Sequence, residues 1–217
     1  MTLAGSLTAW LDRMLFARPF EGRSARRYAT AARPAFGDLD ERLLDAWTDR
    51  LASASTLLDV GSGPATFSRR AAERFPHLRV IALDPSRDFA RPCAALQVVR
   101  ARGEALPLET GTVDLAICLS SIRYVRDQAA TLRELRRVVR PGGRLAIVEL
   151  DPVASRTRIA AHADVLGSPW LRRAFGPLLL RTAPRVERIE AIARASGWQR
   201  AALHDDPVQP VYVLELD

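Results

Sequence analysis

A single glycine-rich stretch, Leu57–Ser68 (LLDVGSGPATFS), constrains the fold more than any other part of the chain. The apolar run at residues 56–60 predicts a short buried strand, and apolar residues recur at helical intervals in Ala65–Phe75. Gly61 and Gly63 lie between these two elements, where residues with little or no side chain let the backbone turn sharply. We therefore expect a ligand to meet bare backbone beside the positive N-terminal end of a helix.

The details of this loop argue against a nicotinamide dinucleotide, which many proteins bind with a similar strand-to-helix turn. The third glycine of the G-x-G-x-x-G pattern is missing, because Thr66 takes its place, and an acid, Asp59, precedes Gly61 by two residues. A carboxylate there would repel a pyrophosphate but suits a cationic, amine-bearing ligand. The stretch resembles the nucleoside-binding motif of the class I S-adenosylmethionine (SAM)-dependent methyltransferases. The simpler alternative is a glycine turn that only connects two core elements.

Length and composition fit one domain, residues 1–217, with a core of sizeable volume. The formal net charge is +7, and all 32 basic residues are arginine, with no lysine in the chain. This bias is typical of genome base composition, and the arginines are scattered rather than gathered in a basic block interleaved with aromatics. We therefore expect no nucleic-acid partner, although the net charge could favour anionic substrates.

The two cysteines, Cys93 and Cys118, offer neither metal-ligand spacing nor a disulfide framework. We expect no metal site and a reducing, cytoplasmic location. No apolar run approaches the ~20 residues of a membrane-spanning helix, and the N-terminus lacks the pattern of a signal peptide. We therefore expect a soluble, unprocessed protein that does not insert into membranes, and the sequence makes no prediction of its oligomeric state.

Two amphipathic helices are predicted before the first strand. A stripe of apolar residues marks the first, within Leu3–Leu15. Asp38, with Glu41 three residues later, predicts a capping box at the start of the second. The second helix carries four apolar residues on one face: Leu39, Leu43, Trp47 and Leu51.

In the methyltransferases that this sequence resembles, N-terminal helices pack over the mouth of the cofactor and substrate site. The resemblance implies that residues 1–52 form a helical lid across the C-terminal edge of the sheet. The irregular segment Phe20–Phe36 is the candidate for its moving part, and Tyr28 is the first residue of that segment to test. Tyr28 could equally be an aromatic residue that simply anchors the loop.

A second acid follows the next predicted strand, Arg79–Leu83, which ends at Asp84 and Pro85. A carboxylate at the C-terminal end of the strand after a glycine loop can accept hydrogen bonds from both ribose hydroxyls. The methyltransferase family carries its ribose-binding acid at this position, so the resemblance assigns that role to Asp84.

A third strand is predicted at Leu96–Arg100, followed by residues 103–108 (GEALPL). The family has a similar segment that meets the adenine ring, which implies that Glu104 and Ala105 contact adenine. Either acid, Asp84 or Glu104, taken alone could be an ordinary solvated loop residue.

Two more strands, Val113–Cys118 and Arg144–Leu150, are predicted on either side of a helix that Asp127 can cap. Leu119–Val125 follows the first of them, at the edge where open α/β sheets bind ligands. The whole span from residue 113 to 150 resembles the ubiquinone and menaquinone C-methyltransferases and their many small-molecule relatives.

This resemblance implies an α/β fold with a Rossmann-like, seven-stranded methyltransferase sheet in the order 3-2-1-4-5-7-6, strand 7 being antiparallel. Residues 53–151 would form the SAM-binding core, and residues 152–217 a substrate-wall segment with a closing helix and hairpin. Apolar spacing predicts that helix, ending at Gly197, and two short runs predict the antiparallel strands, Gln199–His204 and Val211–Leu216.

The predicted cofactor is therefore SAM. Nine residues are predicted to bind it: Asp59, Gly61, Ser62, Gly63, Asp84, Pro85, Glu104, Ala105 and Leu119.

The candidates for acceptor chemistry are Arg123, Tyr124 and His162, with Glu149 as a further possible base. Arg123 occupies the place of an arginine in the quinone-precursor subgroup, where a cation could steady a phenolate or carboxylate of the acceptor. Alternatively, Arg123 is one more surface arginine. His162 could likewise be an exposed or core histidine without a catalytic role.

These features predict a SAM-dependent methyltransferase that transfers a methyl group to carbon or oxygen of a small, aromatic or anionic metabolite. Methyltransferases of nucleic-acid amino groups have an acid or amide followed by Pro-Pro-aromatic after the fourth strand, whereas this chain has residues 118–121 (CLSS). An RNA or protein methyltransferase stays the second hypothesis. A non-catalytic SAM-binding module that works through interactions is the third.

Overall fold

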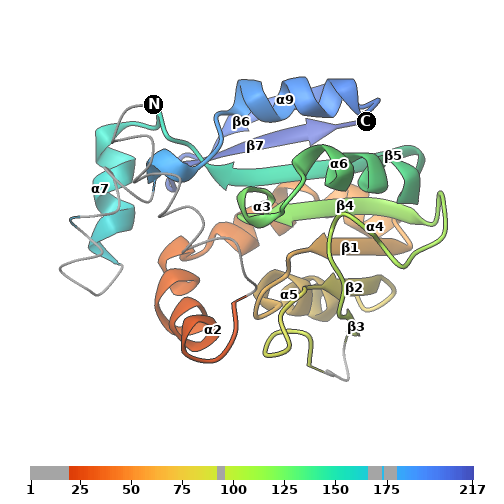
Figure 1. Cartoon of the computed structure of the whole chain (residues 1–217), viewed down its shortest axis with the longest axis horizontal. Helices are drawn as coiled ribbons and strands as arrows, with labels where there is room; N and C mark the ends of the chain where they lie inside the picture. Colours follow the sequence, from red (N-terminus) through yellow and green to blue (C-terminus); the bar gives the residue numbers. More distant parts are fainter. Residues whose placement is uncertain (1–19, 92–95, 166–172, 174–179) are drawn as a thin grey trace.

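The computed structural model describes residues 20–91, 96–165, 173 and 180–217. One sheet forms its centre, with the strand order β3-β2-β1-β4-β5-β7-β6 (Figure 1). Strands β1 to β5 pair in parallel, and β7 runs antiparallel to both β5 and β6. The α/β fold class and the predicted strand order are thus confirmed. The strands are β1 Thr56–Val60, β2 Arg79–Leu83, β3 Gln97–Val99, β4 Val113–Leu119, β5 Val139–Leu150, β6 Arg200–Asp205 and β7 Val211–Leu216.

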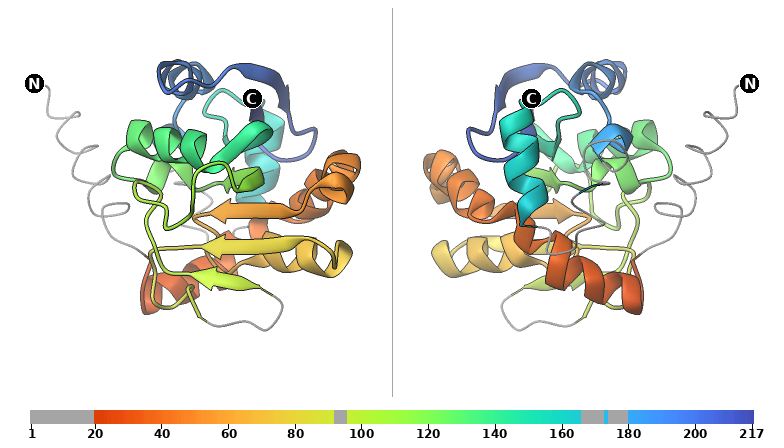
Figure 2. Two further views of the ribbon diagram at one scale, coloured as in Figure 1. Left: turned by 90° about the vertical axis from the view of Figure 1, so that its right-hand side faces the viewer. Right: turned by 90° about the vertical axis from the view of Figure 1, so that its left-hand side faces the viewer.

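Helices cover both faces of this sheet, which is why its central strands are continuous apolar runs. In Figure 2, α6 (green) and α5 (tan) lie on opposite sides of the stacked strands. The short helix α2 lies beyond the C-terminal ends of β1 and β4 (Figure 1). The helices are α2 Arg23–Arg27, α3 Leu39–Ala46, α4 Thr48–Ser53, α5 Thr66–Arg74, α6 Gln128–Val138, α7 Arg156–Asp164 and α9 Val186–Ala195.

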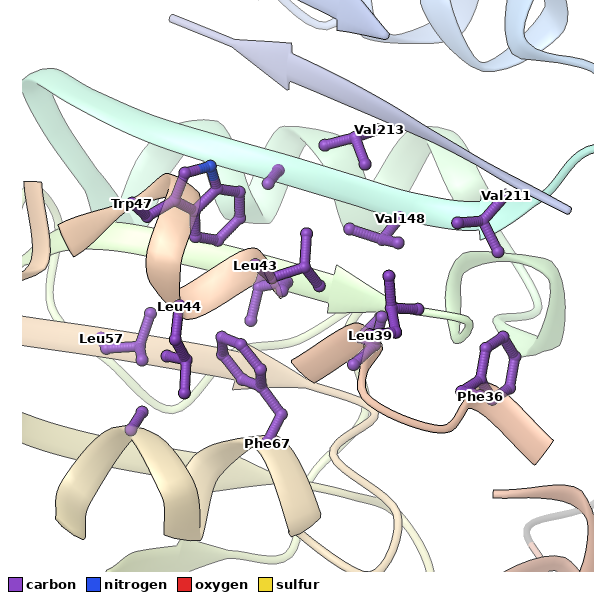
Figure 3. Packing of buried hydrophobic residues seen from close by; sticks show 14 of the residues in the cluster. Phe36, Leu39, Leu43, Leu44, Trp47, Leu57, Phe67, Val148, Val211 and Val213 are labelled. Atoms are coloured by element: carbon purple, nitrogen blue, oxygen red, sulfur yellow. The ribbon is translucent and has the colours of Figure 1, made fainter. Parts of the chain in front are cut away.

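Each face of the sheet has its own hydrophobic core. On one face, α6 and α9 bury Leu132, Leu135 and Ile189 against the sheet, and Trp198 closes that core. On the other face, α3, α4 and α5 pack over β1, β4, β5 and β7. Figure 3 shows this second core, in which Trp47, Leu43 and Phe67 from the helices belong to one cluster with Leu57 and Val148 from the sheet. The two layers hold the C-terminal ends of the parallel strands at one edge.

The structure corrects the prediction for the second N-terminal helix. It is broken at Trp47 into α3 and α4, and Asp38 makes no capping hydrogen bond because its carboxylate pairs with Arg42 instead. The indole N–H of Trp47 donates to Glu215 on β7 at 3.0 Å. The predicted apolar face is buried, but against a face of the sheet, so α3 and α4 do not belong to a lid across its edge. The helix predicted within Leu3–Leu15 lies outside the described residues.

Two further differences from the prediction are found: the segment Phe20–Phe36, predicted to be irregular, contains α2 and a π-helix at Tyr28–Ala32, and the start of β5 is shifted. This strand begins at Val139 rather than Arg144, because its first residue pairs with Val113 before the register shifts. The closing hairpin of β6 and β7 is antiparallel, as predicted.

Asp127 caps α6, and its removal should measurably destabilise the protein. Its carboxylate accepts a hydrogen bond from the backbone N–H of Ala130 at 2.9 Å. We expect Asp127→Ala to lower the free energy of unfolding by about 0.5–2 kcal/mol, since that N–H loses its partner. Asp38→Ala is the control, because Asp38 makes no such bond. Urea denaturation measures both, and an equal loss in the two variants would contradict the capping role.

Candidate functional site

The glycine loop after β1 has the close backbone approach that its sequence predicts. Gly61 has φ +73° and Gly63 has φ +54°, in the left-handed region that favours glycine. The N–H groups of Gly61 and Ser62 both donate to the carbonyl of Leu83, at 2.8 and 3.0 Å, which ties the loop to the end of β2. A Cβ on Gly61 would lie 2.5 Å from Cβ of Ser121. The loops after β1 and β4 therefore meet here with no room for a side chain on Gly61.

Asp84 stands at the end of β2, facing this loop. Its Oδ2 accepts from the N–H of Gly63 at 2.9 Å, and its Oδ1 accepts from the N–H of Ser86 at 2.8 Å. Burial raises the pKa of Asp84, while those two N–H groups oppose the rise. Each carboxylate oxygen can accept a further hydrogen bond, so Asp84 is fixed in position and still able to receive two hydroxyls.

A cavity of about 80 Å³ lies between the glycine loop and the ends of β2 and β4. Five of the predicted cofactor-binding residues line it: Gly61, Gly63, Asp84, Pro85 and Glu104. Ser62, Ala105 and Leu119 do not line this cavity, although each is next in sequence to a lining or loop residue. Sequence reasoning missed two further residues of the wall, Phe89 and Arg102, whereas Ser120 and Ser121 lie in the segment Leu119–Val125 that was expected at the ligand-binding edge.

Glu104 joins two segments of the cavity wall. Its Oε1 accepts from the N–H of Arg126 at 2.7 Å and from that of Asp127 at 3.2 Å. The carboxylate therefore holds the loop after β4 against the loop after β3. Oε2 makes no hydrogen bond with any described residue, so Glu104 can serve both this structural purpose and a ligand.

Asp59 is placed behind the glycine loop rather than in the cavity wall. Its Oδ2 accepts from the hydroxyl of Ser68 at 2.6 Å, and its buried Oδ1 has no hydrogen-bond partner among the described residues. Asp59 therefore does not line the cavity, and its role toward a cationic ligand stays a prediction. Burial raises the pKa of Asp59 to about 7, and the Ser68 bond opposes that rise.

The raised pKa of Asp59 gives a pH dependence of stability with a definite sign. The folded protein keeps a proton on Asp59 up to about pH 7, whereas the unfolded chain loses it near 3.8. Between these values the folded state binds more protons, so the contribution of Asp59 to stability falls as pH rises, by ~4 kcal/mol as an upper limit.

Asp59→Asn should remove this slope, because the amide oxygen can still accept from Ser68 while the side chain no longer titrates. The measured quantity is the difference in free energy of unfolding between wild type and Asp59→Asn, from pH 4 to 8. We expect the variant to become more stable relative to wild type as pH rises to 7, and the difference to stay constant above that pH. Parallel curves over the whole range would contradict the assignment.

Aromatic rings close the outer side of the cavity. The Phe20 and Tyr28 rings are 5.1 Å apart between centroids, and Phe20 meets the Tyr124 ring edge-on at 5.3 Å. The hydroxyl of Ser86 donates to the carbonyl of Phe20, and Asp88 accepts from the N–H of Gly22 at 2.6 Å. These two bonds tie the segment from Phe20 onward to the loop that carries Asp84.

Burial raises the pKa of both Tyr28 and Tyr124. Both phenols are consequently protonated at neutral pH, so Tyr124 is suited to donate a hydrogen bond and not to act as a base.

Arg123 is buried, contrary to the alternative that it is one more surface arginine. Its side chain is 7% exposed, and its Nε lies 3.5 Å from Oε1 of Glu149, which is fully buried on β5. Burial raises the pKa of Glu149, and the charge of Arg123 opposes that rise. The guanidinium also lies over the Tyr124 ring, 5.2 Å from its centroid. The predicted residues Arg123, Tyr124 and Glu149 are thus brought together beside the cavity.

His162 lies apart from this group. It is 3% exposed on α7, its Nδ1 is 2.6 Å from Oε1 of Gln209, and its ring packs edge-on against Phe36. Burial lowers its pKa, which keeps the ring neutral at pH 7. His162 lines neither this cavity nor the second, adjoining hollow that Arg123 lines. The alternative of a core histidine therefore agrees with its surroundings, and its predicted catalytic role does not.

The part of the chain that the structure describes has no group of three or more His, Cys, Asp or Glu side chains that could hold a metal ion. Within the same residues, no helix has the length and apolar character to cross a membrane.

Comparison with known proteins places these features in one family. Residues 58–147 match the model of a family described as a methyltransferase domain. A demethylmenaquinone methyltransferase from Thermobifida fusca is 32% identical over 174 residues, covering 69% of this chain and 71% of that protein. A ubiquinone/menaquinone biosynthesis C-methyltransferase from Syntrophotalea carbinolica is 31% identical over 153 residues, covering 62% of this chain. The chain spans 61% of the length of that second relative.

The fold is shared with solved structures at lower identity. A SAM-dependent methyltransferase from Aquifex aeolicus superimposes with a TM-score of 0.68 at 16% identity, covering 91% of this chain and 98% of that one. The glycine loop and the acid after β2 lie within residues 58–147, the part of the chain that matches the family model. The chain belongs to the class I SAM-dependent methyltransferase family.

Proposed function

We propose that this protein is a cytoplasmic enzyme that uses SAM to methylate carbon or oxygen of a small aromatic or anionic metabolite. The observation that carries the proposal is the position of Asp84. Its carboxylate faces the glycine loop across the cavity, is held by two backbone N–H groups, and keeps acceptor capacity on both oxygens.

The residues around Asp84 fit a nucleoside. A ribose can place two hydroxyls on the Asp84 carboxylate, and Gly61 and Gly63, which line the same cavity, present backbone to the adjoining part of the ligand. Glu104, with Oε2 still available, lies on the same wall and is suited to the adenine edge. The cavity volume of about 80 Å³ is below the several hundred Å³ of a typical ligand site, and the segment with Phe20 and Tyr28 forms part of its wall.

Bound SAM supplies an activated methyl group on its sulfonium. The protein then has to align an acceptor atom with that group and exclude water, and such positioning can contribute ~7–11 kcal/mol toward the barrier. The rings of Phe20, Tyr28 and Tyr124 are placed to exclude water, and Tyr124 can donate a hydrogen bond to an acceptor oxygen. Arg123 can stabilise a nearby negative charge on the acceptor.

The proposal is tested by incubating the protein with radiolabelled SAM and separated fractions of a cell extract: small molecules, RNA and protein. We expect label in the small-molecule fraction. Label in the RNA or protein fraction alone would overturn the proposal in favour of a macromolecular substrate. Binding of S-adenosylhomocysteine (SAH) without transfer to any fraction would favour a non-catalytic SAM-binding module.

A further inference from the structure

A second hollow, of about 720 Å³, adjoins the cofactor cavity. Val125 and Arg126 line both, so the two spaces share one wall, and Arg123 lies on the side of the larger hollow. The remaining wall comes from the start of α6 and from the segment that leads into α9.

The charge of this hollow is strongly positive. Four arginines line it, and Asp127 is the sole acid among the lining residues that the structure describes. Glu149 neutralises part of the charge of Arg123. Across the described part of the chain, the side chains of the other three make no ion pair and no hydrogen bond: Arg126, Arg185 and Arg188. Three cations without counter-charges around one space repel one another, and an anion among them would relieve that repulsion.

Two helices add to the positive potential, because both begin at this hollow. α6 starts at Gln128 and α9 at Val186, and residues from the first turn of each line the wall. Asp127 caps α6, whereas Arg185 at the N-cap of α9 makes no side-chain capping bond, which leaves N–H donors at that end. Helix N-termini favour anions.

Arg123 provides an independent indication of a ligand. Its side chain is more than nine-tenths buried, and its Nε has no hydrogen-bond partner, the nearest acid oxygen being 3.5 Å away. Arg123 lines the hollow and its guanidinium lies over the ring of Tyr124, which lines the cofactor cavity, so an anionic group in the hollow could complete its hydrogen bonds.

We propose that this hollow binds a carboxylate or phosphate group of the methyl acceptor, through Arg126, Arg185 and Arg188. The inference rests on the proposed function and narrows its substrate class. The acceptor is a small anionic molecule whose charged group lies in the hollow while its reacting atom reaches the cofactor cavity past Val125 and Arg126. The volume of the hollow exceeds what one small anion fills, which suits an acceptor with more than one charged or bulky group.

Calorimetry with inorganic phosphate and with citrate tests the site on the SAH-saturated protein. We expect at least one probe to bind, with an affinity that falls as NaCl is raised from 50 to 500 mM. The double variant Arg185→Ala/Arg188→Ala should weaken that binding at least tenfold. The matched control is Arg69→Ala/Arg133→Ala, which also removes two exposed arginines but lies outside the hollow, and should change it less than twofold. Arg185→Gln/Arg188→Gln repeats the test with smaller changes in side-chain size.

The SAH affinity of every variant distinguishes failure of the proposed function from failure of the anion site. If SAH fails to bind the wild type, the proposed function fails. If SAH binds but neither probe does, or if the control weakens probe binding as much as the double variant, the anion site alone is overturned. In the labelled-SAM assay, the acceptor should be found in the fraction that an anion exchanger retains at pH 8. An acceptor in the flow-through would also overturn the anion site. The same holds if neither probe binds but a single-stranded oligonucleotide binds the wild type and fails to bind the double variant.

Discussion

Asp84→Ala should weaken the binding of SAM and SAH by about 1.5–3 kcal/mol for each ribose hydrogen bond that the carboxylate receives, or roughly tenfold to a hundredfold per bond. The variant also takes away the acceptor for the N–H groups of Gly63 and Ser86, which hold the two loops together. Both consequences act in the same direction, so this substitution should have a larger effect on cofactor affinity than any other single change in the cavity.

Calorimetric titration with SAH measures this effect directly. Asp84→Asn should give an intermediate affinity, since it keeps one acceptor oxygen and substitutes a donor for the other. Glu109→Ala removes an exposed carboxylate elsewhere and should leave the affinity unchanged. NAD should not bind the wild type. Unaltered SAH affinity in Asp84→Ala, or measurable binding of NAD, would refute the assignment of Asp84 to the ribose.

The parts of the site that could be predicted from sequence are those that lie within short contiguous motifs. Gly61, Gly63 and Asp84 follow strands whose apolar runs are unambiguous, and parallel strands carry their C-terminal ends to one edge. Phe89, which was missed, and Ser121, which was expected at this edge but not assigned to the cofactor, enter the wall through loop conformation. Ser121 is drawn in by its bond to the carbonyl of Val60, at 2.6 Å, which no local pattern encodes.

The misplaced helix illustrates a second limit. Apolar spacing at Leu39, Leu43 and Trp47 correctly predicts that one face of the chain is buried, but it carries no information about the surface that covers it. The deciding contact is between residues far apart in sequence, because Glu215 on β7 receives both the Trp47 indole N–H and the Arg50 guanidinium, at 3.0 and 2.6 Å. That pairing holds α3 and α4 on the sheet face.

Burial of a single arginine is likewise invisible in a chain with 32 of them. The structure identifies Arg123 as exceptional because Glu149, on the neighbouring strand β5, stands fully buried beside it. Removing one member of such a pair leaves the other charge buried without compensation. We therefore expect Arg123→Met to lower the free energy of unfolding by about 3–5 kcal/mol.

A double-mutant cycle with Glu149→Gln tests this interpretation. Each single variant leaves a buried group without its partner, whereas Arg123→Met/Glu149→Gln removes both charges, so the double variant should be less destabilised than the sum of the singles. Arg194→Met, which breaks the exposed Arg194–Glu190 pair, serves as the control and should lose less than ~1 kcal/mol. Additive losses in the cycle would show that the two buried side chains do not depend on each other.

The pH dependence of the Arg123→Met variant supplies a further test, whose sign follows from the burial of Glu149. Burial already raises the pKa of Glu149, and loss of the arginine should raise it more. The folded variant then holds a proton that the unfolded chain releases near 4.5, so its stability relative to wild type should fall as pH rises from 5 to 8.

Because Arg123 does not line the cofactor cavity, SAH affinity of Arg123→Met should stay within about threefold of wild type while methyl transfer is lost. Retained transfer would leave Arg123 with a structural role alone.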